Sequence, residues 1–264
     1  MLNVLLTRLR QGHRTASYPK SEPILPDRFR GLLQIDANKC LTLRNPQKQN
    51  DCVKCATICP TNAIRVIAEQ GPQIDLGKCI FCGDCVHACP TQAVTHSSIY
   101  PMSTRQRSDL NISHNKTLAL AKPLAHELRR IFKRSLHLRQ VSAGGCNACE
   151  SDINVLSTLT FDLGRFGIKM VASPRHADGL IITGPVTENM KLALEKTYAA
   201  VANPKIVIAV GACAISGGLF AGHTQTHNGI DNLLPVDLYI PGCPPHPYTI
   251  LDGLLRLLGR LPKQ

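Results

Sequence analysis

Residues 52–64 and 82–94 of this chain carry the same cysteine pattern. The segments read CVKCATICPTNAI and CGDCVHACPTQAV, and they align at an offset of 30 residues. Three cysteines coincide in the two segments, and a proline follows the last cysteine of each. Self-similarity at a fixed spacing indicates a duplicated structural unit. We therefore expect one compact domain with two related halves in this part of the chain.

The second copy is complete, because Cys79 precedes it at the spacing Cys-x2-Cys-x2-Cys-x3-Cys-Pro. This is the run of bacterial two-cluster ferredoxins, in which the fourth cysteine binds the neighbouring cluster. Thiolates are the soft ligands that iron–sulfur clusters need. Three closely spaced thiolates wrap one cluster, and we expect the fourth to stand at the start of a short helix and reach the other.

The first copy departs from this spacing. Eleven residues separate Cys40 from Cys52 where two are usual, so we infer an insertion of nine residues within LTLRNPQKQND (41–51). We assign one 4Fe-4S cluster, the first site, to Cys40, Cys52, Cys55 and Cys89. We assign another, the second site, to Cys59, Cys79, Cys82 and Cys85. Zinc sites also use Cys-x2-Cys pairs, but the duplication and the two Cys-Pro endings favour clusters.

Four of the twelve cysteines remain, and they lie in the second half of the chain. Apolar, β-branched runs precede them, as in KIVIAVGAC (205–213) and VDLYIPGCPP (236–245). Such runs predict buried parallel strands. Together with an intervening helical segment, NMKLALEKTYAAVA (189–202), they predict an α/β domain with a flavodoxin-like parallel sheet.

Loops at the carboxyl ends of parallel strands converge at one edge of the sheet. We therefore predict a third 4Fe-4S cluster, the third site, held by Cys146, Cys149, Cys213 and Cys243. A thioredoxin-like dithiol at CNAC (146–149) is an alternative, but it uses two of these cysteines and leaves two without a role. Buried free thiols are another alternative.

The overall composition agrees with metal-bound cysteines. We find no secretory or twin-arginine signal and no apolar run near the ~18 residues that a membrane span needs. Structural disulfides are rare in the cytosol, so twelve cysteines there suggest metal. The formal net charge of +12 favours an anionic partner such as nucleic acid or a membrane surface. Three clusters at about −2 each offset about six of these charges.

The C-terminal motifs resemble a known family. LHLRQVSAGGCNACE, GACAISGG and PGCPPHP resemble the small subunit of membrane-bound group 4 NiFe hydrogenases of the formate hydrogenlyase type, and its homologue, the 20 kDa subunit of respiratory complex I. Residues from RFRG to CPTQAV resemble the two-cluster ferredoxin subunit of the same complexes. The Cys146-x2-Cys149 spacing is the hydrogenase pattern, since complex I relatives typically have two adjacent cysteines. They also carry Arg-Pro-Glu where this chain has His246, Pro247 and Tyr248.

The resemblance implies an electron-transfer subunit with three 4Fe-4S clusters, and no catalytic residue or nickel on this chain. Its expected partners are a large catalytic subunit, membrane-arm subunits and a donor such as formate dehydrogenase or ferredoxin, at the cytoplasmic side of the cell membrane. One alternative is a complex I-like assembly without nickel. A remote one is a basic zinc protein that binds nucleic acid, although we expect no nucleic-acid partner.

We expect four segments along the chain: an arm (1–30), a ferredoxin domain (31–99), a linker with a basic helix (100–135) and the small-subunit-like domain (136–264). Residues 100–125 are polar and typical of a linker. In the arm, Leu2, Leu5, Leu6 and Leu9 share one helical face, which predicts an interfacial or subunit-docking helix. A frayed terminus is the alternative. Glu150, next to Cys149, is a candidate proton relay or a residue that tunes the cluster potential. The alternative is an acidic residue that the helix dipole favours at a helix N-terminus.

Overall fold

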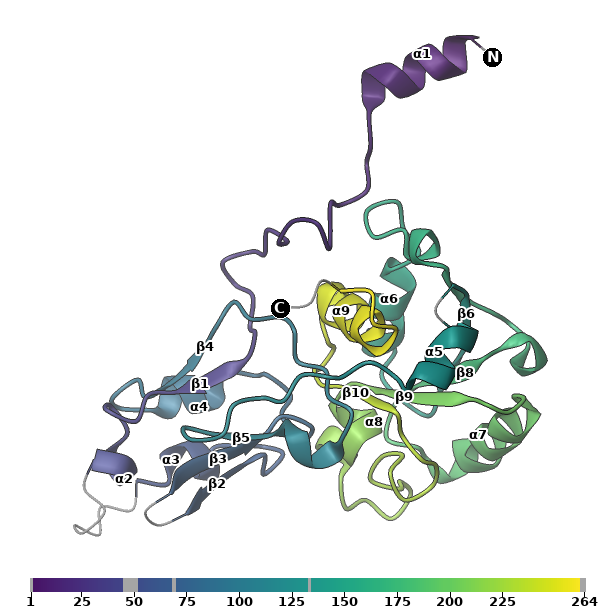
Figure 1. Cartoon of the computed structure of the whole chain (residues 1–264). Coiled ribbons are helices and arrows are strands. Elements are labelled where there is room, and N and C mark those ends of the chain that lie inside the picture. The colour runs from purple at the N-terminus through teal and green to yellow at the C-terminus, as the bar shows by residue number, and fades with distance from the viewer. Residues whose placement is uncertain (1, 45–51, 68–69, 133, 262–264) are drawn as a thin grey trace.

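The computed structural model describes residues 2–44, 52–67, 70–132 and 134–261. An N-terminal arm leads into a ferredoxin-like module, and a larger α/β module follows (Figure 1). Residues 45–51, which make up most of the proposed insertion, lie outside the described residues. Among the residues described, no helix is both long and apolar enough to cross a membrane.

The ferredoxin-like module has two halves of the same design. β1 pairs with β4 and β2 pairs with β3, both antiparallel, so that each half supplies one strand to each pair. Leu33, Val94, Ile64 and Ile74 of these strands are buried together. The elements, in chain order, are β1 (Leu33–Ile35), α2 (Leu41–Arg44), α3 (Lys54–Thr57), β2 (Ile64–Ile67), β3 (Gly71–Asp75), α4 (Asp84–Ala88) and β4 (Val94–His96).

The fourth cysteine of each run follows a short helix instead of starting one. α3 ends at Thr57, just before Cys59, and α4 ends at Ala88, directly before Cys89. The expectation of a helix start was therefore wrong. Pro60 and Pro90 explain the difference, because a proline pushes the residue before it out of the α-helical region.

The segment expected as a polar linker contributes to the ferredoxin-like module. Its short helix η1 (Arg107–Leu110) leads into β5 (Asn111–Ser113), which pairs antiparallel with β3 and places Ile112 opposite Ile74. Leu110 and Ile112 are buried. A strand of three residues is too short to show a periodic pattern, so this strand could not be predicted from its own residues.

The larger module is built on a parallel sheet, as the sequence predicted. Within the described residues its strand order is β10-β9-β8-β6-β7, with every neighbouring pair parallel. The elements are α5 (His126–Phe132), β6 (Leu136–Ser142), α6 (Ala148–Val155), η2 (Leu163–Phe166), β7 (Ile168–Met170), η3 (Pro174–His176), β8 (Gly179–Thr183), α7 (Glu188–Ala200), β9 (Ile206–Val210), α8 (Ala212–Ser216), η4 (Gly218–Phe220), β10 (Leu238–Ile240) and α9 (Pro247–Leu257).

Helices cover both faces of this sheet. Ile206 and Ile208 of β9 pack with residues of α6 and α9 on one face. Val207 and Ala209 point to the other face, where they pack with α7 and α8. The core on this second face also includes Leu33 and Ile74 of the ferredoxin-like module, so the two modules share one apolar core.

Candidate iron–sulfur centres

The structure brings the four cysteines assigned to the first site together around one cavity. Cys40 lies just before α2, Cys55 lies in α3, and Cys89 directly follows α4. Cys52 completes the ring, and Pro72 and Val94 line the same cavity. Cys40 belongs to this group despite the long separation in sequence, because the chain folds it back against the cysteines of the first copy.

The four cysteines assigned to the second site line a separate cavity. Cys79 and Cys82 come from the loop before α4, Cys85 from α4 itself, and Cys59 from the first copy. Each site therefore takes three cysteines from one half of the module and one from the other. His96 of β4 lines the cavity of the second site as well.

Backbone N–H groups donate hydrogen bonds to the sulfurs in the same way in both halves. The N–H of Ala63 lies 3.2 Å from the Cys59 sulfur, and the N–H of Ala93 lies 3.2 Å from the Cys89 sulfur. Burial disfavours ionisation of Cys89, but the surrounding N–H groups outweigh it and lower its pKa. Hydrogen bonds of this kind stabilise a thiolate, which is the form that binds metal.

The third group of cysteines lies at the carboxyl ends of three parallel strands. Cys146 and Cys149 follow β6, Cys213 lies in α8 after β9, and Cys243 follows β10. Two glycines make room for the sulfurs. A Cβ at Gly211 would lie 2.5 Å from the Cys149 sulfur, and one at Gly218 would lie 2.8 Å from the Cys213 sulfur.

The third group is open to the surface on one side. Cys146 and Cys243 are exposed, whereas Cys149 and Cys213 are partly buried. The buried Glu150 lies directly behind it and accepts a hydrogen bond of 2.6 Å from the Thr183 hydroxyl at the end of β8. Glu150 is thus held in place beside the sulfurs rather than extended into solvent.

The thiols of each group are close enough to disfavour one another's ionisation. Burial raises the pKa of Cys55 to about 11, and the other three sulfurs of the first site add to the rise. Burial likewise raises the pKa of Cys213 to about 11, with additions from Cys243 and Cys146. Four such thiolates need a positively charged group between them, and the iron atoms of a cluster supply that charge.

The residues present fit clusters of this kind. The sulfurs of the first site line one cavity, and those of the second site line another. Soft thiolates in sets of four, supported by N–H donors, are the ligands of 4Fe-4S clusters. The fold and these sites therefore define an iron–sulfur protein.

The second site lies between the other two. Burial raises the pKa of Cys85 to about 12, and besides the sulfurs of its own site, Cys55 of the first site contributes. Partial burial raises the pKa of Cys243, and both Cys146 of its own group and Cys82 of the second site contribute. The sulfurs of neighbouring sites are thus near enough to interact electrostatically, in the order first, second, third.

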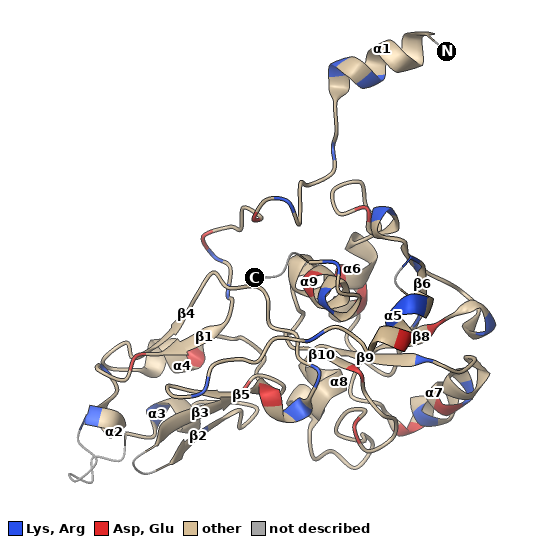
Figure 2. Ribbon diagram, viewed as in Figure 1, with Lys and Arg blue, Asp and Glu red and all other residues tan. Residues whose placement is uncertain are grey.

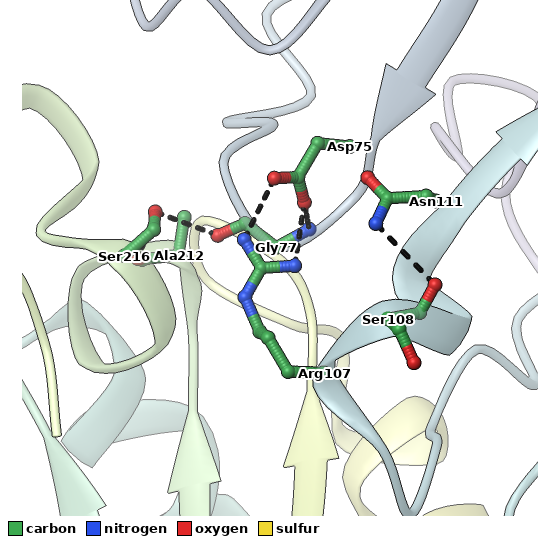
Figure 3. Close-up of polar contacts among 7 residues, drawn as sticks. All are labelled: Asp75, Gly77, Arg107, Ser108, Asn111, Ala212 and Ser216. Atoms are coloured by element: carbon green, nitrogen blue, oxygen red, sulfur yellow. Dashed lines mark hydrogen bonds and ion pairs between the residues drawn. The ribbon is translucent and has the colours of Figure 1, made fainter. Parts of the chain in front are cut away.

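A polar network joins the loop of the second site to the helix of the third (Figure 3). The Arg107 guanidinium donates to both carboxylate oxygens of Asp75, at 2.8 and 2.7 Å. The same carboxylate accepts from the Gly77 N–H at 2.9 Å, and the Gly77 carbonyl accepts from the Ser216 hydroxyl of α8 at 2.9 Å. This network holds the two modules together at Gly77, which lies two residues before Cys79.

Two residues near the second site were not predicted from the sequence. Arg30 donates hydrogen bonds to the carbonyl oxygens of Phe81 and Cys82. The Nδ1 of His96 lies 3.2 Å from the Gly31 carbonyl oxygen, which requires that nitrogen to donate. Both residues reach the site through contacts between distant segments, so no local motif revealed them.

Comparison with known proteins identifies the family. Residues 146–257 match the family of the NADH ubiquinone oxidoreductase 20 kDa subunit, and residues 48–93 match a 4Fe-4S dicluster domain. The first match begins at Cys146 and spans the whole third group, whereas Cys40 lies outside the second match. The chain belongs to the family of the 20 kDa subunit, a family of oxidoreductase subunits, with a dicluster ferredoxin domain in front.

Three relatives illustrate the similarity. A probable membrane-bound hydrogenase subunit of Pyrococcus furiosus is 42% identical over 52% of this chain and 82% of its own length. Formate hydrogenlyase subunit 7 of Escherichia coli is 45% identical over 54% of this chain and 56% of its own length. A subunit of the NADH-quinone oxidoreductase of Phocaeicola vulgatus is 44% identical over 42% of this chain and 57% of its own length.

Proposed function

We propose that this chain carries three 4Fe-4S clusters and transfers electrons between a reduced donor and the catalytic large subunit of a membrane-associated NiFe hydrogenase of the formate hydrogenlyase type. The observation that carries the proposal is the grouping of all twelve cysteines into three sets of four, with the second set between the other two. The similarity to hydrogenase and formate hydrogenlyase subunits supports it.

The ligands of each cluster are those of the three sites. When bound, such clusters accept and release single electrons. The fold places the three sites one after another in space, since Cys85 is near Cys55 and Cys243 is near Cys82. Because the first site stands at the end of this series, the donor is expected to act there. Formate dehydrogenase and ferredoxin are the donor classes we propose.

The third site is the one we assign to the large subunit. Its cysteines Cys146 and Cys243 are exposed, as expected of a site that faces a partner. With all twelve cysteines used as cluster ligands, we place the nickel on that partner and none on this chain. Glu150, buried beside Cys149, is proposed to relay protons or to tune the third cluster through its hydrogen bond with Thr183.

We further propose a peripheral position at the cytoplasmic side of the cell membrane, next to membrane-arm subunits. The domain division proposed is the arm at 1–30, the ferredoxin domain at 31–99, the linker with its basic helix at 100–135 and the small-subunit-like domain at 136–264. In that division β5 reaches back from the linker to complete the ferredoxin sheet.

A complex I-like assembly without nickel is the second candidate. The family match and the similarity to a subunit of NADH-quinone oxidoreductase favour it. Both candidates use the same three clusters, so they differ in the large subunit and not in this chain.

The test is the iron and nickel content of the complex purified anaerobically through this chain. We expect about twelve iron atoms on this chain, after subtraction of any other iron–sulfur subunits, and about one nickel per complex. Twelve iron atoms without nickel would favour the complex I-like candidate. A content of about eight would contradict a cluster at the third site.

Replacing Cys40 with serine tests its assignment as a ligand of the first cluster. The variant is expected to lose the first cluster, and about four iron atoms with it, because Cys40 lines the cavity of the first site. Electron paramagnetic resonance should show one ferredoxin-type signal lost, with the signal of the third cluster kept. Retention of both ferredoxin-type signals would remove Cys40 from the ligands.

A further inference from the structure

None of the residues of the helix α1 (Leu2–Gln11) is buried against the rest of the protein. It projects from the rest of the chain on an extended segment (Figure 1). Isolated helices of this length are marginal in water, so a helix of ten residues is expected to need a surface to pack on. The chain itself does not supply one within the described residues.

One face of α1 is a row of exposed leucines. Leu2, Leu5 and Leu9 have exposed fractions of 71%, 60% and 80%, and Leu6 between them has 42%. Their spacing of three and four residues places them on the same side of the helix. Such a continuous apolar face left in water is unusual for a soluble protein and marks a site of contact.

The charged residues of α1 and of the segment that follows it, up to Lys20, are all positive. Arg8, Arg10 and Arg14 are exposed, and no acidic residue occurs before Glu22. Figure 2 shows basic residues and no acidic ones on α1. A short helix with leucines on one face and arginines beside them is suited to the boundary of a membrane, where the apolar face enters the acyl region and the arginines meet anionic head groups.

The base of the arm is fixed to the α/β module. The Ala16 N–H donates to the Thr160 carbonyl at 2.8 Å, and the buried Tyr18 hydroxyl donates to Asp252 at 3.0 Å. The loop that carries Thr160, between α6 and η2, lies on the same side of the molecule as α1 (Figure 1). Leu159 in that loop is 77% exposed and adds an apolar side chain to this side.

We infer that α1 is a membrane-surface anchor that lies in the plane of an anionic lipid bilayer, with its leucines in the acyl boundary and Arg10 and Arg14 at the head groups. The occupant is lipid, because every charged residue from α1 to Lys20 is positive and therefore matches anionic head groups. The inference rests on the peripheral membrane position proposed above and makes it specific, but its test needs no catalytic partner.

The test uses the full chain with vesicles of phosphatidylcholine alone or mixed with phosphatidylglycerol. Binding to the mixed vesicles is expected, with little binding to phosphatidylcholine alone and weakening as salt is added. Arg10→Gln with Arg14→Gln should weaken binding about fivefold for each arginine. Leu5→Asp with Leu9→Asp should abolish it. Lys169→Gln with Lys196→Gln is the matched control, because it removes the same charge from exposed positions of β7 and α7.

A tryptophan reporter gives a second, independent measurement. The chain has no tryptophan, so Leu6→Trp introduces a single fluorophore on the apolar face of α1. Its emission should shift to shorter wavelength with the mixed vesicles. Leu192→Trp, at a leucine of α7 that is 58% exposed, should show no shift.

Binding that the α1 variants leave unchanged, or no binding to mixed vesicles, would overturn the inference. So would α1-dependent binding to another subunit of the complex without binding to vesicles. Iron content is measured in every sample. A chain that holds its iron but does not bind vesicles would contradict the membrane anchor and leave the proposed function standing. A chain that binds vesicles but holds no iron would contradict the proposed function and leave the anchor standing.

Discussion

Replacing Cys213 with serine is expected to lower the iron content of the chain from about twelve to about eight atoms. Cys213 lies in α8 among the sulfurs of the third site, and Gly218 leaves space for its sulfur that a larger residue would fill. A serine hydroxyl is a hard and poorly ionised ligand, so it is a poor replacement for a thiolate on iron. Iron analysis and electron paramagnetic resonance of the anaerobically purified chain measure the loss.

Cys85→Ser is the matched control for this experiment. It removes a sulfur from the second site, and it should cost about the same amount of iron while the signal of the third cluster persists. Cys213→Ser should show the opposite pattern, with both ferredoxin-type signals kept. Unchanged iron content and an unchanged spectrum in Cys213→Ser would mean that the proposed ligands of the third site are incorrect.

Cysteine spacing alone predicted which sulfurs share a cavity in the ferredoxin-like module. The spacing is informative because a tight loop wraps three thiolates around one cluster and a duplicated unit exchanges its fourth. Even Cys40, outside the range of the dicluster match, joins the cavity to which its place in the duplication assigned it. The buried strands β8 and β9 were equally predictable, since continuous apolar runs bounded by glycine are typical of parallel strands.

Features that depend on distant segments were not predictable. The proximity of Cys82 to Cys243 joins residues far apart in the chain, and spacing within each motif says nothing about the distance between motifs. The same holds for the contacts of Arg30 and His96 with the second site. The position of Cys59 and Cys89 after their helices was predictable from local sequence, however. The proline that follows each cysteine disfavours a helical conformation at that cysteine.

Replacing Arg107 with alanine is expected to loosen the junction between the second and third sites. Arg107 and Asp75 form a two-pronged ion pair whose side chains are only 25% and 17% exposed. Breaking a buried pair costs more than breaking an exposed one because the remaining charge is left unpaired, and for this half-sheltered position we expect a loss of about 2 kcal/mol in the free energy of unfolding. Anaerobic denaturant unfolding of the chain with its iron bound measures it.

The Asp75–Arg107 pair lies where the loop of the second site meets α8 of the larger module. Asp75 also holds the Gly77 N–H, and Gly77 approaches α8 so closely that an added Cβ would lie 2.7 Å from Ile215. A looser junction separates Cys82 from Cys243, and the rate of electron transfer falls steeply with distance. Reduction of the third cluster by reduced ferredoxin should therefore be slower in Arg107→Ala, while the iron content stays the same. Rapid-mixing kinetics measure the rate.

Lys39→Ala provides the control for this last prediction. Lys39 pairs with Asp36 at 3.7 Å in the same module, but the two side chains are 58% and 42% exposed, so its loss should cost no more than about 1 kcal/mol. It also lies away from the junction and should leave reduction of the third cluster unchanged. If Arg107→Ala and Lys39→Ala had equal stability and equal rates, the Asp75–Arg107 pair would not be what holds the two modules at this distance.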